Sequence, residues 1–215
     1  MIAEYIEHMG SDLSVVNSAR VSFDKESSYN SEGELSGKDV KLINYLASHN
    51  HWTPFSHPQI TVREEVPIFV ARQRFKHMIG FTYNEVSRRY VNDEPSFYKP
   101  VWRNKPEHSI KQGSSGPHAD QIDFNREYSY VLDDCLGLYK SLLKRGVAPE
   151  QARMVLPQSM MTSYYVTGSL AAWARMYKQR IHETSQVEIQ MLANLVGNII
   201  QPLYPISWNA LTCRS

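Results

Sequence analysis

The sequence predicts an α+β fold that forms one domain over residues 1–215. Segments with the apolar spacing of helices and segments with the composition of strands follow each other without regular alternation, which favours α+β over a doubly wound parallel sheet. No G-x-G-x-x-G run follows a predicted strand, so a Rossmann dinucleotide site is not expected. A chain of 215 residues can form a full core, because domains of that size bury roughly 70% of their unfolded surface.

The first half of the chain is expected to form two helices on either side of a strand. Residues 39–49 space their apolar side chains like a helix, and residues 59–63 alternate polar and apolar side chains like a strand. Pro67 suits the first turn of a second helix, which we expect to run to about Met78 and to precede a loop over residues 79–83. Helical spacing predicts its buried face as Ile68, Ala71, Phe75 and Met78.

A long loop and a long helix occupy the middle of the chain. Residues 96–119 are rich in Pro, Gly, Ser, Lys and His, which is typical of a loop, and loops of that length in compact domains usually serve a function. We expect this loop to cover a site. Residues 121–145 then repeat apolar side chains at helical spacing, and Gly146 suits the C-terminal end of that helix.

The last third of the chain is expected to form a strand and three helices. A short helix should occupy residues 149–157, between two prolines, and residues 162–167 have the β-branched and aromatic composition of a strand. A helix should follow over residues 170–180. The last long helix should begin near Ser185–Glu188, which fits a capping box, and end at Pro202.

Composition and charge argue against several classes of protein. The net charge is +1, so the whole molecule has no general attraction for a polyanion such as DNA. No apolar run approaches the roughly 18 residues that a membrane-spanning helix needs, and the acidic N-terminus is unlike a secretory signal. We therefore expect a cytoplasmic protein that binds neither nucleic acid nor a membrane. The cysteines, Cys135 and Cys213, lack the CxxC spacing of a zinc or redox site, so no metal is expected.

Basic side chains nevertheless gather between residues 72 and 90. Arginine forks and a serine hydroxyl can bind a phosphate monoester, because each supplies donors to a dianion that only accepts hydrogen bonds. The same composition also fits a solvated basic surface, and charge alone leaves both interpretations open. The charged and polar members of this stretch include Arg72, Arg74, Lys76, His77, Glu85, Ser87, Arg88 and Arg89.

Short motifs along nearly the whole chain occur in the order of one known family. Residues 72–78 read R-Q-R-F-K-H-M and residues 84–90 read N-E-V-S-R-R-Y. Together they resemble the signature of the flavin-dependent thymidylate synthases, R-Q-W-x-R-H-R followed by N-E-x-S-x-R-Y. The central Arg-His-Arg is replaced by Lys76-His77-Met78, and eight residues instead of seven separate this triplet from Ser87. Other segments that resemble the family in the same order are 10–23, 51–57, 152–157 and 179–189.

The resemblance implies a fold of mixed helices and an antiparallel sheet, with a site for dUMP. It implies that Arg180 is the catalytic residue that favours ionisation of the uracil at N3, since a permanently charged fork stabilises negative charge without exchanging its own proton. From spacing alone, Arg180 could instead pair with Glu183 or Glu188 along a helix. The positions that the resemblance assigns to dUMP are Gln73, Arg74, Lys76, Glu85, Val86, Ser87, Arg88, Arg89, Arg153 and Arg180.

The resemblance also implies FAD, with NADPH and 5,10-methylenetetrahydrofolate as co-substrates, and a homotetramer whose subunits share each active site. FAD would carry the hydride while the protein orients the ligands. Lys76 and Met78 in place of two arginines keep one cation and lose the bidentate geometry, so FAD phosphate binding is expected to need Arg74 or Arg175 as well. The implied FAD contacts are His51, Thr53, Lys76, His77, Met78, Glu85, Ser169 and Arg175.

Two other functions stay open on sequence alone. One is binding of single-stranded nucleic acid, with the 13 tyrosines as stacking platforms, although the near-neutral charge disfavours it. The other is nucleotide binding on the same fold without flavin catalysis, through the change at Lys76 to Met78. Colour separates the three functions, because a flavin enzyme should be yellow and should bleach with NADPH when dUMP is present.

Overall fold

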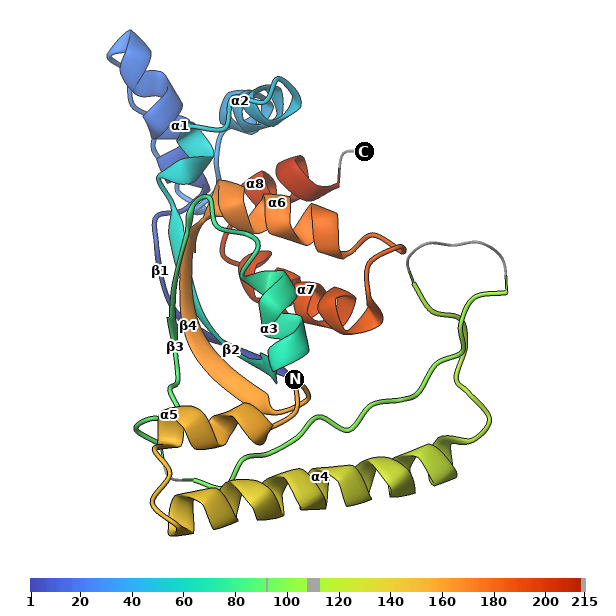
Figure 1. Cartoon of the computed structure of the whole chain (residues 1–215). Coiled ribbons are helices and arrows are strands. Elements are labelled where there is room, and N and C mark those ends of the chain that lie inside the picture. The colour runs from blue at the N-terminus through green and yellow to red at the C-terminus, as the bar shows by residue number, and fades with distance from the viewer. Residues whose placement is uncertain (92, 108–112, 214–215) are drawn as a thin grey trace.

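A four-stranded antiparallel sheet forms the centre of the fold (Figure 1). The computed structural model describes residues 1–91, 93–107 and 113–213. Every pair of neighbouring strands runs antiparallel, with helices placed between the strands along the chain, so the α+β prediction is confirmed. In sheet order the strands are β1 (Ile2–Met9), β2 (Gln59–Pro67), β4 (Met161–Ser169) and β3 (Phe81–Glu85).

Helices pack against one face of the sheet and close the core (Figure 1). In β2, Val62 and Glu64 have no exposed surface and Arg63 between them is exposed, because neighbouring side chains of a strand point to opposite faces. The indole of Trp173 lies in this core and its Nε1 donates to the Ile60 carbonyl oxygen at 3.1 Å. The helices that contribute to the core are α1 (Asp12–Arg20), α2 (Gly37–Ser48), α3 (Ile68–Arg74), α6 (Leu170–Arg180), α7 (Val187–Ile200) and α8 (Pro205–Thr212).

The long helix α4 (Gln121–Lys144) lies along one side of the molecule, next to the short helix α5 (Pro149–Ala152) (Figure 1). Gly146 ends α4 as predicted: its φ is +83°, and its N–H donates to the Leu143 carbonyl oxygen at 3.0 Å. Residues 96–107 and 113–119 run beside α4 in an irregular conformation, whereas residues 108–112 of the predicted loop lie outside the described residues. None of the helices described is long and apolar enough to cross a membrane.

Several elements match the sequence predictions. The helices expected over residues 39–49, 121–145 and 170–180 correspond to α2, α4 and α6. The strands expected over residues 59–63 and 162–167 correspond to β2 and β4, which extend further at their ends. Sequence reasoning does not predict β1, α1 or α8.

One predicted helix end and one predicted helix cap are wrong, although α7 (Val187–Ile200) begins where it was expected. The second helix stops at Arg74, so Met78 is 73% exposed instead of buried, and β3 occupies most of the expected loop at 79–83. The capping box at Ser185–Glu188 does not form. Gln186 is the N-cap of α7, and the Glu188 side chain forms an ion pair with Arg103.

Candidate active site

The basic stretch of residues 72–90 is divided among α3, a turn and β3. The turn depends on Gly80, whose φ is +80° and whose Cβ, if it had one, would lie 2.9 Å from the Cβ of Ala172. Only glycine fits this close approach to α6. The turn brings the Ile79 carbonyl oxygen within hydrogen-bond reach of the Arg175 guanidinium, and places residues 76–79 beside α6.

Arg74 lies in the core and does not reach the surface. Its side chain has no exposed area, its Nε donates to Glu64 Oε1 at 3.1 Å, and its Nη1 donates to the Tyr83 hydroxyl at 2.7 Å. Its guanidinium carbon also lies 4.4 Å from the centre of the Phe81 ring and 4.8 Å from that of Trp173. This geometry speaks against Arg74 as a dUMP contact and as the additional arginine for the FAD phosphates.

Gln73, His77 and Arg180 meet where α3 approaches the end of α6, and we call them the helix group. Arg180 Nε donates to His77 Nε2 at 2.8 Å and Nη2 donates to the Gln73 carbonyl oxygen at 3.4 Å. Because His77 accepts at Nε2, its proton sits on Nδ1. Arg180 therefore pairs with a neutral histidine and not with Glu183 or Glu188, and among the described residues no partner is seen for its remaining N–H groups.

The environment of His77 keeps it uncharged. Its surface is only 7% exposed, and burial, with further contributions from Arg180, Arg74 and Arg175, lowers the pKa of His77 to about 4. The same surroundings act on Arg180, whose pKa is lowered from its ordinary value by burial and by Arg74. A neutral His77 acceptor thus holds the Arg180 fork at neutral pH.

Acid is expected to destabilise the fold through His77. The unfolded histidine titrates near 6.5 and the folded one near 4, so between these values the unfolded chain binds more protons and the free energy of unfolding falls as the pH is lowered. The shift corresponds to a loss of about 3 kcal/mol. Denaturant unfolding at pH 7.5 and pH 4 should show this loss relative to His77→Gln, which keeps an acceptor and gains no proton. An equal pH dependence of both proteins contradicts the assignment.

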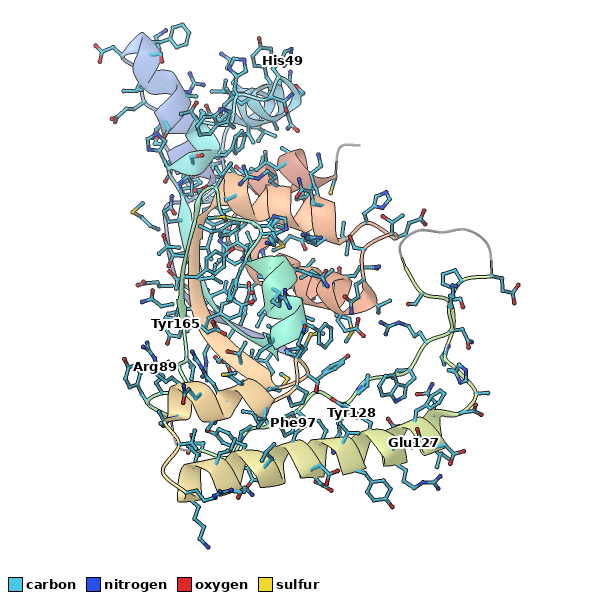
Figure 2. The ribbon with its side chains drawn as sticks, viewed as in Figure 1. His49, Arg89, Phe97, Glu127, Tyr128 and Tyr165 are labelled. Carbon is cyan, nitrogen blue, oxygen red and sulfur yellow. The ribbon has the colours of Figure 1, made fainter. Side chains whose placement is uncertain are left out.

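Residues 85–89 lie at the end of β3, near the start of β4, and Arg153 lies in the segment that leads into β4; we call these residues the loop group. Figure 2 shows Arg89 beside α5. Ser87 Oγ accepts from Arg89 Nε at 3.2 Å, Glu85 Oε1 accepts from Thr162 Oγ1 at 2.6 Å, and Val86 is 48% exposed. Arg88 Nη1 donates to the Asp93 carbonyl oxygen, and the exposed Arg153 lies on a turn of 3₁₀ helix at Arg153–Val155. The exposed Arg89 and the Ser87 hydroxyl on one loop, with the exposed Arg153, suit a phosphate group.

The chain does not bring its two clusters together. Glu85 pairs with Tyr164 near the start of β4, whereas α6, which carries Arg180, begins after the opposite end of that strand. Across the described residues, no hydrogen bond or ion pair joins the loop group to the helix group.

A groove of about 560 Å³ lies between residues 46–56 and α6. His51, Ser169 and Arg175 line it, so three of the predicted FAD contacts come together from separate elements. Ser169 Oγ also accepts from the Ala172 N–H at 3.2 Å and so caps α6. The other predicted FAD contacts do not line the groove: Thr53 and Lys76 are exposed, Met78 is 73% exposed, and His77 and Glu85 belong to the clusters above.

Sequence reasoning misses three polar residues beside the helix group. Gln73 Nε2 donates to Gln186 Oε1, and Gln186 Nε2 donates to Glu188 Oε2 at 2.9 Å. Glu188 in turn pairs with Arg103. The motif similarity at residues 179–189 could have indicated Gln186 and Glu188, but Arg103 lies in a loop without any such signal.

The chain matches a known family over most of its length. The family model described as "Thymidylate synthase complementing protein" matches residues 4–206. The flavin-dependent thymidylate synthase of Thermus thermophilus is 34% identical over 207 residues, which cover 95% of this chain and 73% of that protein. The flavin-dependent thymidylate synthase of Thermosipho africanus is 36% identical over 213 residues, which cover 95% and 88%.

The fold agrees with that of a solved enzyme. The crystal structure of the UMP/dUMP methylase PolB from Streptomyces cacaoi, bound with 5-Br dUMP, matches with a TM-score of 0.87 at 29% identity, over 98% of this chain and 94% of that chain. Similarity in sequence and in fold therefore extends over almost the entire chain. This chain belongs to the family of flavin-dependent thymidylate synthases.

Proposed function

We propose that this enzyme methylates dUMP to dTMP, with FAD as its cofactor. One turnover converts dUMP, 5,10-methylenetetrahydrofolate, NADPH and a proton into dTMP, tetrahydrofolate and NADP⁺. When bound and reduced by NADPH, FAD would supply the hydride that reduces the transferred methylene to a methyl group. The observation that carries the proposal is the groove in which His51, Ser169 and Arg175 meet, because the family resemblance had assigned these three residues to FAD from the sequence.

The groove residues fit a flavin dinucleotide. The volume of the groove, about 560 Å³, lies within the usual range for ligand pockets, roughly 300–1,000 Å³. The indole of Trp52, 65% exposed, lines it and offers a planar apolar surface, while Arg175 supplies a bidentate fork for a phosphate. Met78 cannot make phosphate contacts. We propose that Arg175 replaces them, together with Lys76, which is two residues before Met78 in the sequence.

Each cluster has a separate role toward dUMP. We propose that Ser87, Arg89 and Arg153 hold the phosphate, with the backbone of residues 85–88, and that Gln73 and Arg180 meet the nucleoside. The Arg180 fork, held by His77, stabilises negative charge that develops on the uracil N3 and carbonyl oxygens. This charge stabilisation makes Arg180 the catalytic residue of the chain.

We propose a homotetramer in which each active site joins the loop group of one subunit to the helix group of another. The separation of the two groups within one chain supports sharing. Exposed apolar side chains on α4 support an interface, because such surfaces are usually covered by a partner. They are Ile122 (82% exposed), Tyr130 (64%), Val131 (55%) and Leu138 (50%). We also propose that the chain forms one domain and works in the cytoplasm.

Mixing two inactive variants tests whether sites are shared. Arg89→Ala removes one phosphate-binding arginine of the loop group, and Arg180→Ala removes the arginine of the helix group, so each variant alone should be nearly inactive. After the subunits are mixed under conditions that exchange them, random pairing leaves roughly a quarter of shared sites intact, and turnover should recover to that fraction. Recovery that stays at the sum of the two variants' own activities contradicts a shared site.

The colour of the purified protein tests flavin catalysis. With FAD bound, it should be yellow, and NADPH should bleach the absorbance near 450 nm, about the usual flavin maximum, when dUMP is present. A colourless protein that binds dUMP and cannot be reconstituted with FAD supports the alternative of nucleotide binding without catalysis. UMP is assayed beside dUMP, because PolB is described as a methylase of both.

A further inference from the structure

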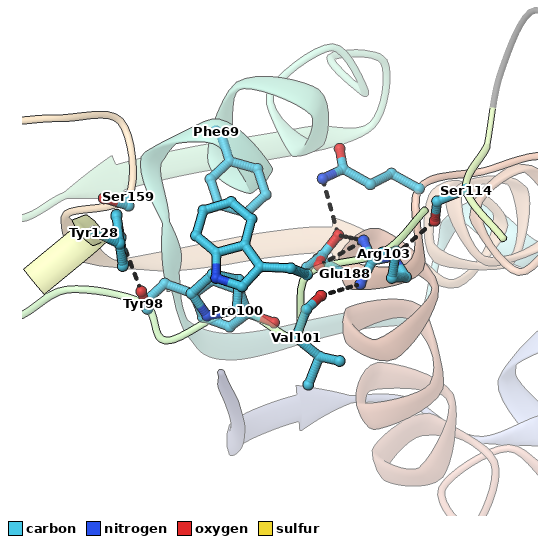
Figure 3. Close-up of a pocket in the computed structure, with 11 residues that line it drawn as sticks. Phe69, Tyr98, Pro100, Val101, Arg103, Ser114, Tyr128, Ser159 and Glu188 are labelled. Carbon is cyan, nitrogen blue, oxygen red and sulfur yellow. Dashed lines mark hydrogen bonds and ion pairs between the residues drawn. The ribbon is translucent and has the colours of Figure 1, made fainter. Parts of the chain in front are cut away.

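Arg103 ties the irregular segment before α4 to the first turn of α7. Its Nη2 lies 2.8 Å from both carboxylate oxygens of Glu188, whose side chain is only 3% exposed (Figure 3). Aromatic contacts fix the segment on either side. The Trp102 ring packs edge-on against Tyr128 with centres 5.5 Å apart, and Tyr128 donates to the Tyr98 carbonyl oxygen at 3.0 Å. Arg103 is therefore held in place by α4 as well as by Glu188.

The carboxylate of Glu188 decides the orientation of two amides. A carboxylate only accepts hydrogen bonds, so Gln186 must present its NH₂ group to Glu188, as it does at 2.9 Å. The Gln186 oxygen then faces away from Glu188 and accepts from Gln73 Nε2. Gln73 consequently keeps its oxygen and one N–H for other partners. The two ends of an amide have the same shape, and it is the charge on Glu188 that distinguishes them here.

We propose that Arg103, Glu188 and Gln186 are positioning residues that hold the Gln73 amide in one orientation for the nucleotide. The proposal rests on the proposed function, since it takes Gln73 as a dUMP contact. Gln73 is also bound by Arg180, whose Nη2 donates to the backbone carbonyl oxygen of Gln73. The chain of contacts thus links residues 98–103, outside both clusters, to the helix group.

An amide fixed before binding loses less freedom when the nucleotide arrives, so disrupting the chain weakens dUMP binding. Glu188→Gln removes the charge and allows the Gln186 and Gln73 amides to turn over. Arg103→Met leaves Glu188 without its cation, and Arg103→Lys restores the charge without the fork. We expect Glu188→Gln and Arg103→Met to raise the dUMP dissociation constant about tenfold, and Arg103→Lys to raise it less.

A double-mutant cycle with Gln73→Leu distinguishes positioning from general stabilisation. Dissociation constants for dUMP are measured by calorimetry on the full chain loaded with FAD, for Glu188→Gln and Arg103→Met, each with and without Gln73→Leu. In the Gln73→Leu background, we expect either second change to alter dUMP affinity by less than about twofold, because the residue through which it acts is gone. FAD affinity should not change. The matched control is Glu4→Gln, which removes a carboxylate from the exposed Glu4–Arg63 pair of β1 and β2.

Three outcomes overturn the inference. The first is an unchanged dUMP affinity in both Glu188→Gln and Arg103→Met. The second is a tenfold loss that persists in the Gln73→Leu background, which would place the effect outside Gln73. The third is an equal loss of FAD and dUMP affinity, which indicates a general structural defect. If the unaltered protein itself fails to bind dUMP, the proposed function falls first, and that result is distinct from the other three.

Discussion

Replacing Arg180 by alanine is expected to lower the kcat for dTMP formation by roughly 10- to 150-fold or more, the effect of one lost charge-assisted hydrogen bond in the transition state. The structure gives this arginine a fixed direction, because Nε is engaged with a neutral His77 at 2.8 Å. Steady-state kinetics with saturating dUMP measures the change. Folding stability should fall far less, by about the 1 kcal/mol of a single neutral acceptor left without its donor.

Two further variants make the Arg180 result specific. Arg180→Lys keeps the positive charge without the planar fork, so it should retain only part of the activity. Arg63→Ala removes an exposed arginine from β2 and should leave kcat within about twofold, as surface substitutions usually have small effects. A kcat for Arg180→Ala equal to that of Arg63→Ala would remove Arg180 from its catalytic role.

Replacing Glu64 alone by leucine is expected to lower the free energy of unfolding by about 3–5 kcal/mol. Both side chains of the Glu64–Arg74 pair have no exposed area, so the change leaves the Arg74 charge in the core without a partner. Tyr164 would also lose the carboxylate to which its hydroxyl donates. For a chain of about this size, the melting temperature should fall by roughly 6–20 °C, which calorimetry measures.

The double variant Glu64→Leu, Arg74→Met controls for the loss of volume. Since apolar residues of similar size often replace a buried ion pair without loss, the double variant should be clearly more stable than either single one. If the three variants lose equal stability, the pair contributes through packing and not through its charges. The family's R-Q-W pattern, with tryptophan where this chain has Arg74, agrees with an apolar residue being accepted at this position.

Helical spacing predicted the elements that bury one continuous face. Residues 39–49 and 170–180 each carry apolar side chains on the side that packs against the core, so periodicity in the sequence reports their burial directly. The predicted helix end at Met78 is wrong. The turn at Gly80 depends on the close approach of Gly80 to Ala172, which the spacing of apolar residues along the sequence cannot show. β1 is an edge strand with mostly exposed side chains, and its pattern carries little signal.

The candidate site could be predicted as a set of residues but not as an arrangement. Motif similarity placed His51, Ser169 and Arg175 at one ligand, and the groove brings them together. It also placed Arg74 at a phosphate, although Glu64 neutralises Arg74 in the core. That pairing depends on how α3 packs against β2, a tertiary contact that charge composition does not reveal. The separation of the loop group from the helix group likewise follows from sheet register and not from sequence order.

The most direct test of the proposed function is to identify the product of a complete reaction. Purified enzyme is loaded with FAD and incubated without oxygen with dUMP, 5,10-methylenetetrahydrofolate and NADPH, and nucleotides are identified by mass spectrometry. We expect dTMP, one NADP⁺ for each dTMP, and no product when FAD is removed. Enzyme that holds both FAD and dUMP and yet forms no dTMP would rule out the proposed function.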